Sequence, residues 1–272
     1  MIKKTVLTAF VLLFAVTSLY PLIWVLMQSL KSDAEFFANQ FAPPTDFLWN
    51  NYSKAWTEEN FDLYYKNTLI VTLFGVALGV LVCVLAGYAF ARYRFYGKKL
   101  LTLSFVGVLF VPIPVLLLPV YFINRDLDLL NTYAGMIGPY ICGIVPLGVL
   151  LMRGAFASLP GEIAESARMD GSGEWRTFGQ IMLPLTTPTI ATVCILQFIT
   201  VWTDYMWPLI ANTNPDMYTL TIGITTMAAQ KFVLGYGPVF AGMVISFSFI
   251  ILVYVFLQKY FMRALSDGAV KG

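Results

Sequence analysis

The sequence predicts an all-α polytopic membrane protein with six transmembrane helices and a structured loop between the fourth and the fifth. Three observations lead to this fold class. Hydrophobic residues make up 58% of the 272 residues and charged residues only 12%, about half the charged share of soluble domains. Six apolar runs are long enough to cross a bilayer as helices, which takes about 20 residues. These runs do not alternate with polar residues, as the strands of a membrane barrel would.

Each apolar run is expected to be helical, because lipid offers no partner to unpaired backbone groups. The first run follows Lys3 and Lys4, so a signal peptide is the alternative there. That run is longer than the apolar region of a signal peptide and lacks a small-residue cleavage signal. We therefore predict one transmembrane domain over residues 1–272, with spans at about residues 5–30, 68–91, 100–123, 130–152, 186–210 and 238–259.

The distribution of Lys and Arg predicts the orientation of these spans. The N-terminus, the turn at residues 92–99 and the tail at residues 260–272 are basic, whereas the long segment at residues 31–66 is rich in acids. Short cytoplasmic loops carry an excess of Lys and Arg. Both termini and the 159–184 loop are therefore expected in the cytoplasm, which agrees with an even number of spans.

The 159–184 loop concentrates charge between two apolar runs and begins like a helix. Pro160 and Glu162 suit the first turn of a helix. Ile163 and Ala167 continue an apolar stripe with a period of four residues, and Gly171 suits the position just beyond a helix end. The charged side chains of the loop are Glu162, Glu165, Arg168, Asp170, Glu174 and Arg176.

A second helix is expected from about Ser172 to Pro184. Trp175, Phe178 and Met182 would form its apolar face. The predicted helix–turn–helix is either a docking surface for a soluble partner or an ordinary hairpin at the membrane interface.

Composition excludes several classes of function. The chain has no histidine, and its net charge of +2 is too small to indicate nucleic-acid binding. Its three cysteines lie within apolar runs and are expected to be buried free thiols. No segment matches G-x-x-x-x-G-K-[ST], so ATP binding through a phosphate-binding loop is not expected.

One acid, Asp204, lies inside a predicted span. An intramembrane carboxylate is costly and is a candidate functional residue. Its neighbours Trp202, Tyr205 and Trp207 have flat rings that suit stacking on a sugar, so these four residues are a candidate substrate pathway. The alternative is structural, with Asp204 holding a broken helix and the aromatic residues forming an interfacial belt; it is the favoured interpretation.

Several motifs resemble those of ABC-importer permeases. Glu165-Ser166-Ala167, Asp170-Gly171 and Ile181-Met182-Leu183-Pro184 are similar to the EAA loop of that family, with Ser166 in place of an alanine. Further segments resemble its carbohydrate-uptake, maltose-permease-G-like branch, and together they extend over nearly the whole chain. These are Ser29-Leu30-Lys31, Gly87–Arg92, Trp202–Pro208 and the tail Gln258–Gly272.

The resemblance implies a type I ABC importer permease fold and a transport subunit of a prokaryotic cell membrane. The 159–184 loop would be a coupling helix that docks on a separate ATPase. Glu165 would meet a basic group of the ATPase, Ile163 and Ala167 would pack on it, and Gly171 would set the bend. The expected docking residues are Glu165, Ser166, Ala167, Asp170, Gly171, Ile163, Leu183 and Pro184.

The resemblance also implies partners. These are a second homologous permease, nucleotide-binding ATPase subunits in two copies, an extracellular or periplasmic solute-binding protein, membrane lipid and a sugar or oligosaccharide, but no nucleic acid. ATP and Mg²⁺ would be bound by the ATPase, and this chain would need no cofactor. The small residues Gly268, Ala269 and Gly272 suit a tail that touches the ATPase or frays.

Three rival functions differ in what they require. A permease for another solute, such as an amino acid, a polyamine or glycerol phosphate, would share the EAA loop. A membrane-embedded enzyme would need converging ionisable groups, whereas only Asp204 lies within a span. A passive scaffold would not need a glycine-hinged cytoplasmic hairpin.

Overall fold

The computed structural model describes residues 2–269, and it describes their side chains apart from residues 2, 3, 257 and 259–269. All regular elements in this range are helical, which confirms the all-α prediction. The helices are α1 (Ile2–Ser29), α2 (Asp33–Ala38), α3 (Asn50–Ser53), η1 (Lys54–Glu58), α4 (Phe61–Arg92), α5 (Lys98–Val108), α6 (Ile113–Asp126), α7 (Tyr133–Ser158), α8 (Gly161–Met169), α9 (Glu174–Arg176), η2 (Thr177–Met182), α10 (Leu183–Leu185), α11 (Thr187–Thr203), α12 (Met206–Ala211), η3 (Pro215–Met217), α13 (Leu220–Ala229), α14 (Lys231–Leu234) and α15 (Tyr236–Ala269).

Within the described range, four helices are long and apolar enough to cross a membrane: α1, α4, α7 and α15. Two bent pairs raise the number to six if each pair counts as one span. The sequence predicted a third span at about residues 100–123, and in the structure this region is bent, with α5 and α6 meeting at 110°. Pro112 has extended backbone at this bend, and Pro114 lies in the first turn of α6. A proline disfavours helical backbone in the residue before it, so two prolines in three residues explain the break.

The predicted fifth span, residues 186–210, starts at a bend and is interrupted once. Helix α11 meets the preceding segment Glu174–Leu185 at 75°, and Pro188 lies in its first turn. At the other end Asp204 has extended backbone and separates α11 from α12. Asp204 therefore lies at a helix break rather than within a continuous helix.

The chain packs as two compact units, and the single transmembrane domain over residues 1–272 stays a prediction. One unit contains the residues up to Lys66 together with Tyr218–Ile251, and the other contains Asn67–Met217 with the described residues from Leu252 onward. Both α4 and α15 contribute to the two units, because each is continuous through a boundary.

The first unit is organised around the end of α1. Ser29 is fully buried and Lys31 is only 2% exposed. The Lys31 ammonium donates to the Asn39 carbonyl at 2.9 Å, and the buried Asn51 side chain donates to the carbonyls of Ser29 and Lys31. Gly237 lies against Asn51, where a Cβ atom would come within 2.3 Å of the amide nitrogen. These hydrogen bonds satisfy buried polar groups that would otherwise be costly.

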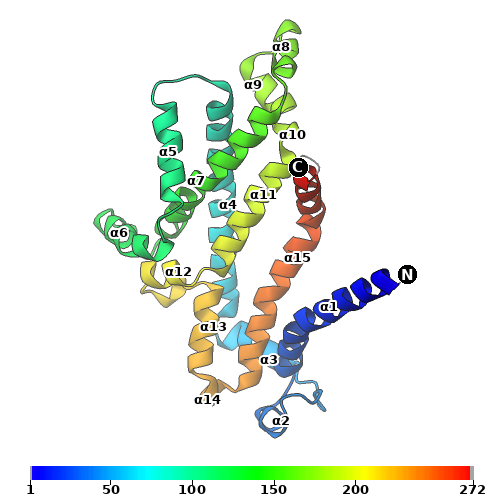
Figure 1. Ribbon diagram of the computed structural model, residues 1–272. Coiled ribbons are helices and arrows are strands. Elements are labelled where there is room, and N and C mark those ends of the chain that lie inside the picture. Colours follow the sequence, from blue (N-terminus) through cyan, green and yellow to red (C-terminus); the bar gives the residue numbers. More distant parts are fainter. Residues whose placement is uncertain (1, 270–272) are drawn as a thin grey trace. The chain divides into compact units, whose positions relative to one another are not determined.

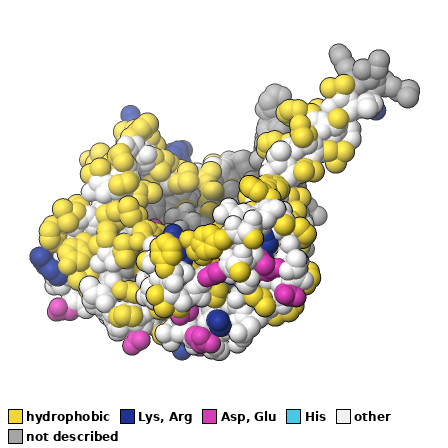
Figure 2. Space-filling model, turned by 90° about the horizontal axis from the view of Figure 1, so that it is seen from below, with side chains coloured by type: hydrophobic (Ala, Val, Ile, Leu, Met, Phe, Trp, Pro, Cys, Tyr) yellow, Lys and Arg dark blue, Asp and Glu magenta, His cyan; other side chains and the backbone are white. Residues whose placement is uncertain are grey.

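Most of α1 has an exposed apolar surface. Its side chains from Lys4 to Ile23 are exposed, and Figure 2 shows hydrophobic side chains covering the arm that this helix forms. Apolar surface of this extent needs lipid or another helix to cover it. The arm is therefore consistent with a helix inside a membrane.

The second unit is built on α4, α7 and α11 (Figure 1). Gln197 of α11 is 1% exposed, and its amide donates to the carbonyl of Tyr140 on α7 at 2.8 Å and to that of Gly75 on α4 at 3.4 Å. A buried amide that reaches two neighbouring helices fixes their register. This bridge lies between two apolar clusters, one around Tyr88 and Phe156 and one around Met136 and Trp207.

Candidate functional site: the 159–184 loop and the break at Asp204

The loop between α7 and α11 folds as a short helix, a tight bend and a second helix. Helix α8 covers Gly161–Met169, with Pro160 before it and Glu162 in its first turn, as predicted. Gly171 has a φ of +79° and donates to the Arg168 carbonyl, while Ser172 donates to the Ala167 carbonyl at 2.9 Å. This pair of bonds is a Schellman motif, which satisfies the last carbonyls of a helix and needs left-handed backbone. The predicted role of Gly171 as the residue that sets the bend agrees with this geometry.

The apolar side of α8 faces its own chain. Ala164 and Ala167 are buried, Ala167 being 6% exposed, and Ile163 is half-buried against the Tyr88–Phe156 cluster. The sequence analysis assigned Ile163 and Ala167 to packing on an ATPase; in this structure the chain itself buries Ala167, whereas Ile163 keeps part of its surface. The apolar stripe is present as predicted, and part of it packs on the chain's own Tyr88–Phe156 cluster.

The opposite side of α8 is an open, acidic groove. Its volume is about 570 Å³, and its polar lining comes from one helix face and the first residue of the bend. Four of the lining residues have polar side chains, and the fifth, Met169, is 88% exposed. The lining residues are Glu162, Glu165, Ser166, Met169 and Asp170. Of the predicted docking residues, Glu165, Ser166 and Asp170 thus share one accessible surface.

The second helix of the loop runs from Glu174 to Leu185, and part of it is a π-helix, η2. Phe178 and Met182 pack in the Tyr88–Phe156 cluster as expected, but Trp175 is 80% exposed. Pro184 was predicted to end this helix, whereas the helix continues to Leu185. Pro184 has no N–H to donate to a preceding turn. The wider turns of η2 directly before it accommodate that missing bond.

The remaining two predicted docking residues differ in exposure. Leu183 is half-buried against the Tyr88–Phe156 cluster, so it anchors the loop from inside. Pro184 is exposed. Met169 and Trp175 are the exposed apolar side chains that sequence reasoning missed as candidates for docking. The sequence signal for both was a large apolar residue next to charged residues at the end of a predicted helix.

The end of α4 holds both parts of the loop. Arg92 donates to the Leu159 carbonyl at 3.1 Å, and the Tyr93 hydroxyl donates to Glu174 at 3.0 Å. Glu174 also accepts from Arg168 at 2.6 Å, which joins the second helix to α8. Hydrogen bonds from Arg168 and then from Tyr93 hold the pKa of the Glu174 carboxyl below its usual range. A lowered pKa means that this contact is present above the ordinary carboxyl pKa and is lost in acid. Motion of α4 would therefore reach both helices of the loop.

The second candidate site is the helix break at Asp204. Its carboxylate accepts from the Tyr140 hydroxyl at 2.8 Å and from the backbone N–H of Met206 at 3.0 Å. The first contact ties the break to α7, and the second stabilises the start of α12. Asp204 is half-buried. The structural interpretation given above therefore accounts for this intramembrane carboxylate.

The aromatic neighbours of Asp204 do not form an open stacking surface. Trp202 is 1% exposed and stacks on Phe198 with ring centroids 5.6 Å apart. Trp207 is 4% exposed and donates to the Met136 carbonyl at 3.2 Å. Both rings pack in the interior of the chain, which fits the structural interpretation; the substrate pathway stays a prediction. Tyr205 is half-buried.

For Gly268 and Ala269, which were predicted to touch the ATPase or fray, only the helical backbone is described, and Gly272 lies outside the described residues. Within residues 2–269, no group of three Cys, Asp or Glu side chains is placed to hold a metal ion.

Comparison with known proteins gives consistent matches over nearly the whole chain. A family model described as binding-protein-dependent transport system inner membrane component matches residues 64–267. The diacetylchitobiose uptake system permease protein NgcG of Streptomyces coelicolor is 33% identical over 97% of this chain and 87% of its own length. The arabinooligosaccharides transport system permease protein AraQ of Halalkalibacterium halodurans is 32% identical, with 95% and 93% covered.

The fold also matches a solved structure. The crystal structure of a bacterial ABC transporter involved in the import of the acidic polysaccharide alginate superposes with a TM-score of 0.82. The two chains are 26% identical, and 96% of each is covered.

Proposed function

Because the chain belongs to the family of binding-protein-dependent transport system inner membrane components, we propose that it is one of two related permease subunits of an ATP-driven sugar importer. Members of this family are transport subunits and not enzymes. Each subunit would form half of the translocation pathway. ATP and Mg²⁺ would be bound by two copies of a cytoplasmic ATPase, and this chain itself would carry no cofactor.

A sugar or oligosaccharide is the substrate class that the relatives support. The names of the relatives described above refer to diacetylchitobiose and arabinooligosaccharides, and the solved structure belongs to an importer of alginate. All three substrates are carbohydrates made of several units. This agreement favours a carbohydrate over an amino acid, a polyamine or glycerol phosphate.

The coupling role is supported mainly by one observation: α8 has one face buried against the chain and one face open to a partner. Its small residues are buried against the chain, so α8 is fixed to the unit, while Glu162, Glu165 and Asp170 remain open. A surface of carboxylates beside an exposed Met169 suits a partner that offers basic groups around an apolar pocket. Tyr93 and Arg168 connect this surface to α4 and to the second helix of the loop. ATP-driven closure of the ATPases would thus move the spans as the loop moves.

Reversing one charge in the groove tests this role. Glu165→Lys is expected to lower ATP-driven sugar uptake by about tenfold or more, because a lysine would face the basic groups of the ATPase. Uptake of labelled sugar into vesicles and recovery of the ATPase with the permease would be measured together. Asp126→Lys, at an exposed acid of α6 outside the groove and outside the segments assigned to the solute-binding protein, is the matched control and should keep both. Full uptake and full ATPase recovery with Glu165→Lys would show that the groove is not the docking surface.

The orientation of the chain is part of the same proposal. We place both termini, the turn at residues 92–99 and the 159–184 loop in the cytoplasm, following the distribution of Lys and Arg. The segments at residues 31–66 and 211–237 would face the solute-binding protein on the outer side.

Accessibility labelling checks this orientation. In a background without the three native cysteines, Ser166→Cys is expected to react with a membrane-impermeant maleimide only from the cytoplasmic side. Thr57→Cys, also at an exposed position, is expected to react only from the outer side. Labelling of Ser166→Cys in intact cells would contradict both the orientation and the coupling role.

A further inference from the structure

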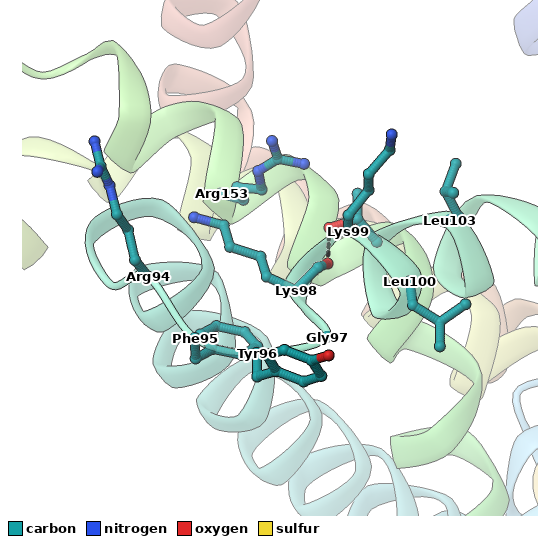
Figure 3. Close-up of a pocket in the computed structure, with 10 residues that line it drawn as sticks. Arg94, Phe95, Tyr96, Gly97, Lys98, Lys99, Leu100, Leu103 and Arg153 are labelled. Atoms are coloured by element: carbon teal, nitrogen blue, oxygen red, sulfur yellow. Dashed lines mark hydrogen bonds between the residues drawn. The ribbon is translucent and has the colours of Figure 1, made fainter.

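A basic groove lies between the end of α4, the start of α5 and α7, apart from the loop described above. Its volume is about 910 Å³, and four cationic side chains line it: Arg94, Lys98, Lys99 and Arg153. Figure 3 shows these side chains extending toward one side of the groove, with Tyr96 and Leu100 on the other side. The groove therefore has one side that carries the four cations, with Leu103 beside Lys99, and one apolar side with Tyr96 and Leu100.

The four cations have no acidic counterpart within the described residues. Neither of the two ion pairs found there involves them. The Lys98 ammonium donates to the Tyr93 carbonyl at 3.0 Å, and Arg153 is half-buried on α7. Like charges that converge on one groove repel each other, and a half-buried cation is poorly hydrated. An anion in the groove would relieve both costs.

The start of α5 adds to the positive potential. Gly97, with a φ of +80°, precedes the helix, and no side chain caps its first N–H groups. The N–H groups and the helix dipole at such an end favour a phosphate or another anion. Helix α5 has eleven residues, so its peptide dipoles add up along several turns. The positive end of this dipole lies beside the charges of Lys98 and Lys99.

The apolar side of the groove has the character of a membrane interface. Tyr96 is fully exposed, and Leu100 and Leu103 are exposed on the first turns of α5. Aromatic rings gather where lipid headgroups meet the acyl chains. Cations beside exposed leucines match a molecule with an anionic head and a hydrocarbon tail. A soluble anion would gain nothing from the leucines.

We propose that this groove binds the headgroup of an anionic phospholipid, with the phosphate held by Lys98, Lys99 and Arg153 and the acyl chains lying along Leu100 and Leu103. This inference goes beyond sugar transport, because it needs only the membrane location of the chain. At such a site, the amount of anionic lipid in the membrane would affect the segment that joins α4 to α5.

Photocrosslinking to a phospholipid tests the proposal. The assembled transporter is placed in phosphatidylcholine vesicles that contain a photoactivatable phosphatidylglycerol, and labelled peptides are identified by mass spectrometry. Peptides from residues 94–103 are expected to carry the label. The double variant Lys98→Gln/Lys99→Gln should lose label by at least about tenfold, since each cation near a membrane surface adds to lipid binding. Lys3→Gln/Lys4→Gln removes the same charge from another basic segment and should leave the label unchanged.

Further measurements distinguish an anionic phospholipid from a soluble anion, a neutral lipid or a protein partner. Arg153→Lys keeps the charge and should keep the label, whereas Arg153→Gln should weaken it. Excess inorganic phosphate should not displace the lipid, because the acyl chains contribute to binding. Equal labelling in the Lys98/Lys99 variant would overturn the proposal. So would displacement by phosphate, equal labelling by a photoactivatable phosphatidylcholine, or crosslinks to another protein subunit in place of lipid.

Discussion

Replacing Gly171 with proline is expected to lower ATP-driven sugar uptake by at least about tenfold while the chain still reaches the membrane. Proline fixes φ near −65°, whereas Gly171 has a φ of +79°. The substitution also removes the N–H that donates to the Arg168 carbonyl. The Schellman motif would be lost. Arg168 would then no longer be oriented to form its ion pair with Glu174. The exposed groove on α8 would then no longer be held in a fixed relation to α4.

A second glycine in the same helix provides a matched control. Gly161 is the first residue of α8, follows the extended backbone of Pro160 and has no neighbour within 4 Å of an added Cβ atom. Proline is well tolerated at this position, because the N–H there has no partner inside the helix. Gly161→Pro should therefore keep uptake. If the two variants transported equally well, the bend at Gly171 would have no part in coupling.

The sequence contained enough information to predict the bend but not the surface that the helix presents. A glycine just after an apolar stripe indicates a helix end, and Gly171 is found there with left-handed backbone. The period of Ile163 and Ala167 indicates an apolar face, yet periodicity does not say whether a partner or the chain itself covers that face. Only the packing of Ala167 in this structure distinguishes the two.

Other features depended on contacts between distant residues. Trp175 and Phe178 were expected on one face, and their rings do meet, with centroids 6.4 Å apart, but Trp175 lies at the start of the helix and is 80% exposed. Pro112 and Pro114 were a local signal for the break before α6, but the length of the apolar run indicated one span. The bridge from Gln197 to two helices has no local signal, because its partners lie 57 and 122 residues away.

The close approach of α4 and α7 leads to the second large expected effect. Gly87 of α4 lies against α7, where an added Cβ atom would come within 2.4 Å of the Met152 Cβ and 3.0 Å of the Arg153 backbone nitrogen. Backbone atoms cannot move aside as the end of a flexible side chain can. Gly87→Ala is therefore expected to lower the free energy of unfolding by about 1–3 kcal/mol, the usual cost of overpacking a core. Gly148 faces Cys83 with a similar restriction.

The matched variant is Gly154→Ala on α7, which has open space around the added methyl group. Alanine there should be neutral or should stabilise the helix by about 0.5–1 kcal/mol, because it loses less backbone entropy than glycine on folding. Thermal unfolding of the two purified variants in the same detergent gives the comparison. Gly87 contacts α7 one turn from Phe156. Gly87→Ala should therefore also loosen the Tyr88–Phe156 cluster, which supports α8. Equal stability of the two variants would mean that α4 and α7 do not approach as closely as Gly87 permits, and the support for α8 would then have to come from other contacts.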